Sequence, residues 1–318
     1  VDVLKLVASL VRSSTLPSLL HLSLARSSLS SSDIDALSTL LSASEKVSIN
    51  LSDNGLSTDA LTTVLSGAAR SSRSSNLDVD FSYNDCSGGA AQVLHAVNVA
   101  RNVIRCLNLR LTKLSLSDKH ELFIGLKKQK QLRQLVLSFE SANPKRSVDK
   151  QLKLTMTALH ELLLGGIVEK LAIYSNPPKY ALTHHLYLLL SNLSNYSSLR
   201  YLDIYGNLIG DEGAVLLGEQ LGESGCVLET LHIDRNDISR KGLDALLVGA
   251  RQSNTLCDLV YPVKDINRAR RRDRADADAM HAALVKLKRD VLRRNAVHKV
   301  ERRRKAKEEA KVKAATPD

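Results

Sequence analysis

The stretch LRYLDIYGNLIGDEG, residues 199–213, decides the fold because its spacing recurs along the chain. Its apolar residues and single asparagine follow the pattern L-x-x-L-x-L-x-x-N-x-I, and residues 228–238 repeat that pattern in full. A pattern that recurs at such a period is typical of a solenoid, in which each coil stacks only on its neighbours. Most of the chain follows this spacing, so the repeat organises the molecule.

Nine copies of the repeat strand can be placed along the chain, 27 to 36 residues apart. Their centres are Leu22, Ile49, Val79, Leu107, Leu135, Leu171, Leu202, Leu231 and Leu259. A period of about 28 residues has room for a strand, a loop and a helix. Apolar residues at helical spacing predict helices over residues 33–42, 58–65, 211–221 and 241–250.

Alternate residues of a strand point to opposite faces of a sheet. Leu202 and Ile204 are therefore expected to face the helices, and Asp203 and Tyr205 to face the open, concave side. An asparagine follows several strands at a fixed offset, and we expect its amide to satisfy backbone groups between coils. These asparagines are Asn54, Asn84, Asn176, Asn207 and Asn236.

This pattern resembles the ribonuclease-inhibitor-like class of leucine-rich-repeat proteins, which includes the Ran GTPase-activating proteins and the repeat arrays of innate-immune receptors. The resemblance covers residues 15–263 and is strongest over residues 171–242, while Thr112 replaces the asparagine of the fourth copy. It implies an α/β fold, a right-handed horseshoe of about eight or nine strand–helix repeats. It also implies that the horseshoe holds a partner and is not an enzyme, because most members of this class bind and do not catalyse.

Three parts are expected: an N-terminal capping helix over residues 1–18, the repeat domain over residues 19–263, and a basic helical extension over residues 264–318. The net charge is +11, and the last part holds 19 Lys and Arg against 9 Asp and Glu. One long helix is predicted from about residue 274 to residue 312. Its apolar seam changes phase after Val291 and consists of Ala277, Met280, Leu284, Leu287 and Val291.

The outward-facing side chains of the last copies are the expected protein-binding surface, because Tyr and Arg are favoured binding anchors. They are Tyr174, Asp203, Tyr205, His232, Asp234 and Arg235. The alternative is a simply solvated sheet face. We expect a protein partner there, with this chain as one subunit of a larger complex.

The cations after the repeats are the expected polyanion-binding residues, since Lys and Arg clusters bind phosphates. They are Arg268, Arg270, Arg271, Arg272, Arg274, Arg293, Arg294, Arg302, Arg303, Arg304 and Lys305. This part of the chain has no aromatic residue, so any nucleic-acid contact is expected at the backbone. Three interpretations stay open: a cap on the last repeat, an RNA-binding helix, and a helix that binds an acidic protein or an anionic membrane.

The sequence contains no catalytic motif, no phosphate-binding loop and no zinc signature, so no catalytic residue, metal or cofactor is expected. His184 and His185 are interpreted as a solvated or packed pair. Four scattered cysteines predict reduced thiols and an intracellular, cytoplasmic location, with the nucleus or an organelle left open. No apolar run is long enough to span a membrane, and an insertion over residues 141–149 is expected to be an exposed loop.

We therefore expect a non-enzymatic adaptor whose horseshoe holds a protein and whose basic helix anchors it to a polyanionic assembly. A ribonucleoprotein is the first expectation for that assembly, and a cytoskeletal or ciliary assembly is the second. The competing class is a GTPase-activating regulator of a small GTPase of the Ran type. In that class an edge arginine would act, and Arg26 and Arg110 each follow a strand.

Overall fold

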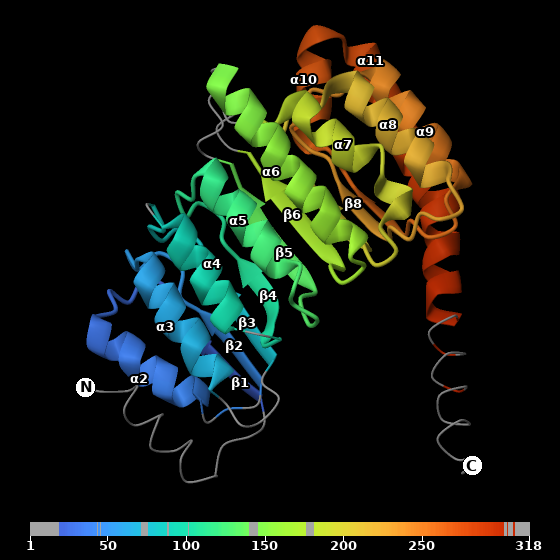
Figure 1. Cartoon of the computed structure of the whole chain (residues 1–318). Helices are drawn as coiled ribbons and strands as arrows, with labels where there is room; N and C mark the ends of the chain where they lie inside the picture. The colour runs from blue at the N-terminus through green and yellow to red at the C-terminus, as the bar shows by residue number, and fades with distance from the viewer. Residues whose placement is uncertain are drawn as a thin grey trace.

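Nine parallel strands form a single open sheet in which the strand order is the chain order (Figure 1). The computed structural model describes residues 19–42, 44, 46–70, 76–87, 89–100, 102–139, 146–175, 181–301, 304 and 308. The strands are β1 (Leu19–Ser23), β2 (Lys46–Asn50), β3 (Asn76–Asp80), β4 (Ile104–Asn108), β5 (Gln134–Ser138), β6 (Lys170–Tyr174), β7 (Tyr201–Asp203), β8 (Thr230–His232) and β9 (Asp258–Val260). This is the architecture of a leucine-rich-repeat solenoid, as the sequence predicted.

Helices cover one face of the sheet and leave the other face open (Figure 1). They are α2 (Ser31–Ser42), α3 (Thr58–Ala69), α4 (Ala90–Val99), α5 (Leu116–Leu126), α6 (Arg146–Leu164), α7 (Tyr187–Leu190), α8 (Gly210–Gly222) and α9 (Arg240–Gln252). Short 3-10 turns, η2 (Thr183–Leu186) and η3 (Leu193–Asn195), flank α7. The four helices predicted from apolar spacing are confirmed, each within a few residues of its expected bounds.

All nine predicted strand centres pair with one another in register, from Leu22 opposite Ile49 to Leu231 opposite Leu259. The centres from Ile49 onward are buried against the helices in one continuous apolar core. Register is strongly specified in such a sheet because a slip of one residue would turn every buried side chain outward.

Asparagines form the expected ladder between coils. Asn207 Nδ2 donates to the carbonyl oxygens of Ile173 at 2.8 Å and Ile204 at 2.9 Å. The backbone amide of Asn207 in turn donates to Asn236 Oδ1 at 3.1 Å. The same arrangement joins Asn54 to Asn84, while Asn176 lies outside the described residues. Each buried asparagine thus satisfies backbone groups of two coils, which costs less than leaving them unpaired.

Two expectations concern segments only partly described. The predicted N-terminal cap over residues 1–18 lies outside the described residues. The loop expected over residues 141–149 is wrong at its end, because α6 already begins at Arg146. Leu152, Met156 and Leu159 are buried at helical spacing, so α6 packs on the core through an apolar stripe that starts in its N-terminal half.

Two helices follow the last strand. The basic run that precedes the long helix predicted from about residue 274 forms a helix of its own, α10 (Val263–Arg272), and α11 (Arg274–Leu287) begins after a break at Asp273. The Asp273 carboxylate caps α11 by accepting from the backbone amides of Ala275 and Asp276. A π turn over Lys288–Leu292 then leads into helix that continues to residue 301.

The seam of α11 packs on the last repeat, against α9 (Figure 1). All five predicted seam residues are buried, and so is Leu292 beside Val291. A π turn inserts one extra residue, which explains the change of phase seen in the sequence. Asn295 completes the contact by donating from Nδ2 to the carbonyls of Ser253 at 2.9 Å and Leu256 at 2.8 Å. The start of the C-terminal part therefore closes the solenoid.

Candidate protein-binding surface

Aromatic rings and guanidinium groups form a row along the C-terminal ends of the parallel strands. We call Tyr83, Arg110, Tyr174, Tyr205 and Arg235 the Arg–Tyr row. The Arg110 guanidinium carbon lies 5.9 Å from the ring centre of Tyr83 and 4.5 Å from that of Tyr174. The rings of Tyr174 and Tyr205 are 6.4 Å apart, and Arg235 lies 5.8 Å from the ring centre of Tyr205. The row therefore extends from the third repeat to the eighth.

A small residue in the intervening repeat allows Arg110 to contact Tyr174. Strand β5 lies between β4 and β6, and its Ser138 pairs in register with Tyr174. Ser138 is buried, and its Oγ accepts a hydrogen bond from the Leu111 backbone amide at 2.7 Å. A larger side chain at this place would fill the space that the Arg110 side chain crosses. The contact is a cation–π pair, worth about 0.5–1 kcal/mol where it is solvent-exposed.

A basic hollow of about 590 Å³ adjoins the end of the row. Its lining includes Tyr205, Arg235, Lys264, Asp265, Arg268 and Arg271. Arg268 is already paired with Asp237 and, at 3.2 Å, with Asp265. Neither Lys264 nor Arg271 forms an ion pair with any residue that the structure describes. The hollow therefore has positive charge available for an acidic group.

Three of the six predicted surface residues lie in the row, namely Tyr174, Tyr205 and Arg235. The two aspartates instead accept hydrogen bonds from backbone amides. Asp203 is buried and accepts from the Tyr205 amide at 3.0 Å, and burial together with Asp203 raises the pKa of Tyr174. Asp234 Oδ1 accepts from the backbone amide of Lys264 at 2.8 Å.

His232, the last predicted residue, is half-buried on the open face of the sheet. Its Nδ1 lies 3.8 Å from Asp203 Oδ2, and its ring packs 5.2 Å from that of Tyr201. Sequence reasoning missed Tyr83, although it directly precedes Asn84 as Arg235 precedes Asn236. Both residues have a positive φ of 61°, the left-handed conformation that this turn imposes.

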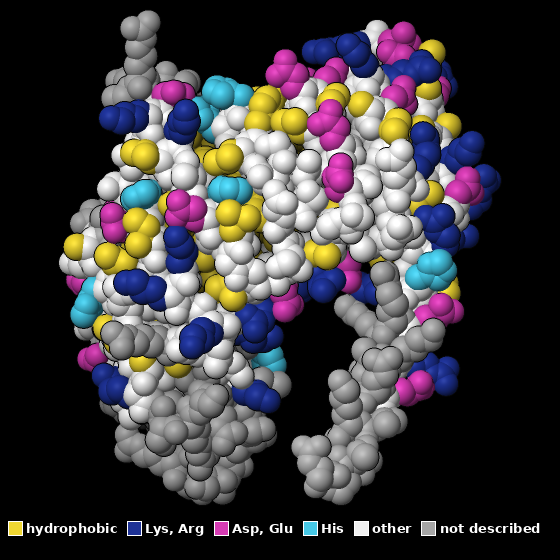
Figure 2. Space-filling view, turned by 45° about the vertical axis from the view of Figure 1, so that its right-hand side comes forward, with side chains coloured by type: hydrophobic (Ala, Val, Ile, Leu, Met, Phe, Trp, Pro, Cys, Tyr) yellow, Lys and Arg dark blue, Asp and Glu magenta, His cyan; other side chains and the backbone are white. Residues whose placement is uncertain are grey.

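Many cations beyond the repeats are paired with acidic residues of the same region, and blue and magenta side chains alternate there (Figure 2). Among the predicted polyanion-binding residues, the paired ones are Arg268, Arg270, Arg274 and Arg304. Arg294 bonds to Asn295, whereas Arg271, Arg272 and Arg293 are exposed with no ion-pair partner in the described part of the chain. Arg302, Arg303 and Lys305 lie outside the described residues.

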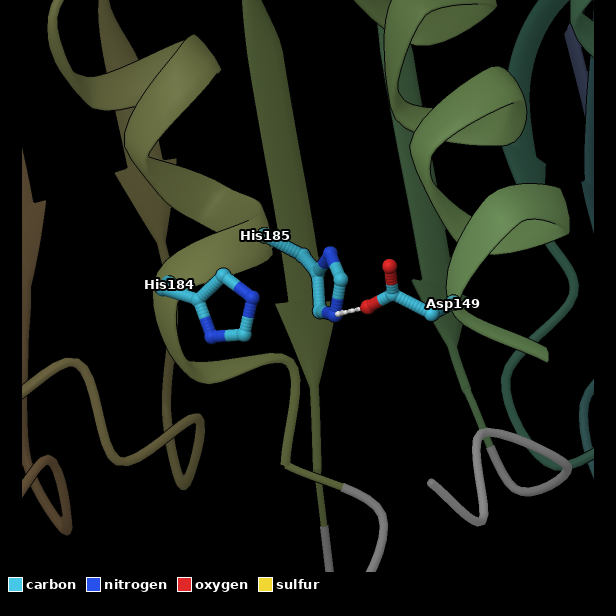
Figure 3. A group of neighbouring side chains, drawn as sticks. All are labelled: Asp149, His184 and His185. Carbon is cyan, nitrogen blue, oxygen red and sulfur yellow. Dashed lines mark ion pairs between the residues drawn. The ribbon is translucent and has the colours of Figure 1, made fainter. Parts of the chain in front are cut away.

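Figure 3 shows a second group of polar side chains, formed by Asp149, His184 and His185. His185 Nε2 lies 3.1 Å from Asp149 Oδ1, and the two imidazole ring centres are 4.1 Å apart. Burial, then the charge of His184, lower the pKa of His185 despite the nearby carboxylate. The sequence predicts a solvated or packed histidine pair and gives no sign that Asp149 joins it.

Burial raises the pKa of three of the cysteine thiols, those of Cys86, Cys106 and Cys226. None of the four cysteines, all of them described by the structure, forms a disulfide, and burial raises the pKa of both Cys86 and Cys106 to about 12. A thiol with so high a pKa holds its proton at neutral pH and reacts slowly. Among the described residues, no helix is long and apolar enough to cross a membrane.

Comparison with known proteins gives partial matches. No protein-family profile matches the chain. The rat and human proteins named capping protein, Arp2/3 and myosin-I linker protein 3 are 28% and 27% identical over 224 residues, which are 70% of this chain and 16% of theirs. The Rho GTPase-activating protein gacW of Dictyostelium discoideum is 31% identical over 125 residues, 39% of this chain and 11% of its own. This chain thus spans less than a fifth of these relatives.

Among solved structures, the leucine-rich repeat-containing protein LegL7 from Legionella pneumophila has a TM-score of 0.44 and 15% sequence identity. The match covers 88% of this chain and 94% of that one.

Proposed function

We propose that this chain is a non-enzymatic protein-binding scaffold whose partner places an acidic surface on the Arg–Tyr row. The observation that carries the proposal is the contact of Arg110 with two tyrosine rings at once, 5.9 Å from Tyr83 and 4.5 Å from Tyr174. The leucine-rich-repeat fold supports it, since such solenoids present extended binding surfaces.

The row has the physical properties of a binding anchor. Tyrosine buries much apolar area at little cost in side-chain entropy and keeps a polar tip, while arginine pairs with carboxylates through a planar fork. Here the rings hold the Arg110 and Arg235 side chains in place before a partner arrives. Less conformational entropy is then lost on binding.

The basic hollow indicates the charge of the partner. Lys264 and Arg271 line it beside Arg235, and only Asp265 contributes a carboxylate to the lining. A partner carboxylate or phosphate placed there would gain charge-assisted hydrogen bonds. We therefore infer an acidic segment on the partner, next to an apolar or aromatic patch that covers the row.

The named relatives bear on the larger assembly. One is named a linker of capping protein, Arp2/3 and myosin-I, and the other a Rho GTPase-activating protein. These names favour a cytoskeletal assembly over the ribonucleoprotein suggested by the positive charge of the C-terminal tail, residues 264–318. The pairing of several tail arginines with aspartates also leaves fewer cations for phosphates than their number implied.

The test starts from cross-linking and mass spectrometry on the full chain to identify the partner. Binding of that partner is then measured to wild type, Arg110→Ala, Tyr174→Ala and, as control, Tyr201→Ala. Tyr201 lies on β7 but outside the row. We expect the two row substitutions to weaken binding at least tenfold and Tyr201→Ala to change it less than twofold. Equal losses in all three variants would contradict docking on the row.

A regulator of a small GTPase is the second candidate, favoured by the relative named a Rho GTPase-activating protein. Arg26 is 82% exposed as a side chain and pairs with Asp53 at 2.9 Å, so it is accessible to a docked GTPase. GTP hydrolysis by Rho-type and Ran-type GTPases is measured with the wild-type chain, Arg26→Ala and Arg110→Ala. No stimulation by wild type would remove this candidate and leave the scaffold.

A further inference from the structure

Two consecutive repeats bring one carboxylate and two imidazoles together. Asp149 stands in the first turn of α6, and His184 and His185 stand in η2, which follows β6 (Figure 3). One potential ligand atom from each residue lies within 4.8 Å of those of the other two. We propose that Asp149, His184 and His185 form a binding site for a divalent transition-metal ion, Zn²⁺ in the first place.

The donor set selects the class of ion. Imidazole nitrogen and carboxylate oxygen together suit Zn²⁺ and its neighbours in the first transition series, whereas Ca²⁺ and Mg²⁺ take oxygen ligands. Tetrahedral zinc with bonds of about 2.0–2.2 Å separates its ligand atoms by about 3.3–3.6 Å. The atoms of His185 and Asp149 are 3.1 Å apart, close to that separation, and the ligand atoms of all three residues lie within 4.8 Å of one another. Rotation about side-chain bonds can adjust these distances, so binding needs only a small rearrangement. The fourth position stays open to water.

A residue in the left-handed conformation directly precedes the histidine pair. Thr183, a β-branched residue, has a φ of 47°, and its amide is held by the Asn207 carbonyl at 2.9 Å. A β-branched residue is a rare outlier in the left-handed region, and such strain is concentrated at functional sites. The fold thus fixes the backbone from which the two imidazoles extend.

The hydrogen bonds of the pair leave nitrogen atoms available. Thr183 Oγ1 lies 3.3 Å from Nδ1 of His184, a contact that orients the ring and frees Nε2. His185 already directs its Nε2 at Asp149. A bound ion would tie the start of α6 to η2 across two repeats.

Cobalt is the spectroscopic probe for this site. Metal-free full chain is titrated with Co²⁺, and visible absorption bands of a tetrahedral ion with nitrogen and oxygen ligands are expected, saturating at one equivalent. Zn²⁺ added afterwards should displace Co²⁺ and bleach the bands. Saturable bands that Zn²⁺ removes support the site, and their absence overturns it.

Matched substitutions locate the ion. His184→Ala, His185→Ala and Asp149→Asn are each expected to weaken Zn²⁺ binding at least tenfold. The controls, His95→Ala on α4 and Asp35→Asn on α2, change exposed residues of the same types and should leave binding unchanged. Equal binding by the first three variants and the controls would overturn the proposal.

Chemical footprinting of the wild-type chain tests the site even if a variant fails to fold. Diethyl pyrocarbonate modifies accessible imidazoles, and mass spectrometry locates the products. Zn²⁺ at one equivalent is expected to protect His184 and His185 several-fold while His95 reacts as before. Uniform reaction of all three histidines with and without Zn²⁺ would contradict the site.

Discussion

The backbone amide of Asn236 donates to Oδ2 of Asp265 at 2.9 Å, so the asparagine ladder ends on an aspartate of α10. Asn207 and Asn236 occupy the same place in the two preceding coils, and Asp265 takes the next rung although the repeat pattern has stopped. Its other oxygen accepts from the Asp237 amide at 3.2 Å and pairs with Arg268. Helix α10 thus closes the ladder with a charged residue.

Removal of this rung should destabilise the last repeat. Asp265→Ala leaves the buried Asn236 amide and the Asp237 amide without their acceptor and Arg268 without one of its partners, so we expect a loss of about 2–3 kcal/mol in the free energy of unfolding. Urea unfolding followed by circular dichroism measures it. The control is Asp35→Ala, an exposed aspartate of α2, with a change expected within about 0.5 kcal/mol.

Asp265 should also make stability depend on pH. Burial raises the pKa of its carboxyl group from 3.8 to about 6, against the opposing effects of its amide donors and Arg268. The folded chain therefore binds the proton more tightly than the unfolded chain. The contribution of the Asp265 carboxyl group to the free energy of unfolding is most favourable below about pH 4. It declines by up to about 3 kcal/mol as the pH rises to about 6.

The measurement compares unfolding free energies of wild type and Asp265→Asn between pH 4 and pH 7. Asparagine keeps an oxygen for the Asn236 amide but does not titrate, so the difference between the two proteins should change across this window. Parallel pH profiles would show that Asp265 ionises normally in the folded chain.

Asn295 should hold the C-terminal helix on the solenoid. Its side-chain amide is buried and donates to the carbonyls of Ser253 and Leu256, so Asn295→Ala is expected to cost about 1–3 kcal/mol. Hydrogen exchange should become faster in α11 and the turn that follows it, and stay unchanged in α3. Asn267→Ala, at an exposed position of α10, is the control. Slow exchange of α11 in both variants would argue against this role.

The tail is better tested by neutralising charge than by deleting it. Deletion of residues 264–318 removes Asp265 and uncovers the buried seam contact, so the last repeats are expected to lose stability. Arg271→Gln, Arg272→Gln and Arg293→Gln together leave the seam intact. We expect earlier elution from heparin and a salt dependence of binding reduced by up to about three counterions. Unchanged elution would exclude these arginines from polyanion binding.

Two substitutions of Tyr196 distinguish the contribution of packing from that of hydrogen bonding in the core. Its hydroxyl lies 2.7 Å from Nδ1 of His160, and the ring is almost wholly buried. Tyr196→Phe should cost about 1 kcal/mol, whereas Tyr196→Ala should cost about 3–5 kcal/mol because it opens a cavity. Thermal unfolding of the two variants checks the order, and equal costs would contradict it.

The sequence by itself determined the repeat, its register and the core. The spacing of leucines and asparagines fixes which side chains face the helices, because strand alternation and helix periodicity are local properties of the chain. The phase change of the seam after Val291 was visible for the same reason, and it corresponds to the π turn. Local patterns of this kind require no knowledge of distant contacts.

Only the tertiary structure decided which distant side chains meet. Arg110 reaches Tyr174 because Ser138 is small, Asp149 meets His184 from the preceding repeat, and Asp265 ends a ladder built by asparagines. Each contact joins residues that stacking brings together across about 30 to 65 positions of sequence. Coil geometry and side-chain size set such distances, and no spacing in a single sequence encodes them.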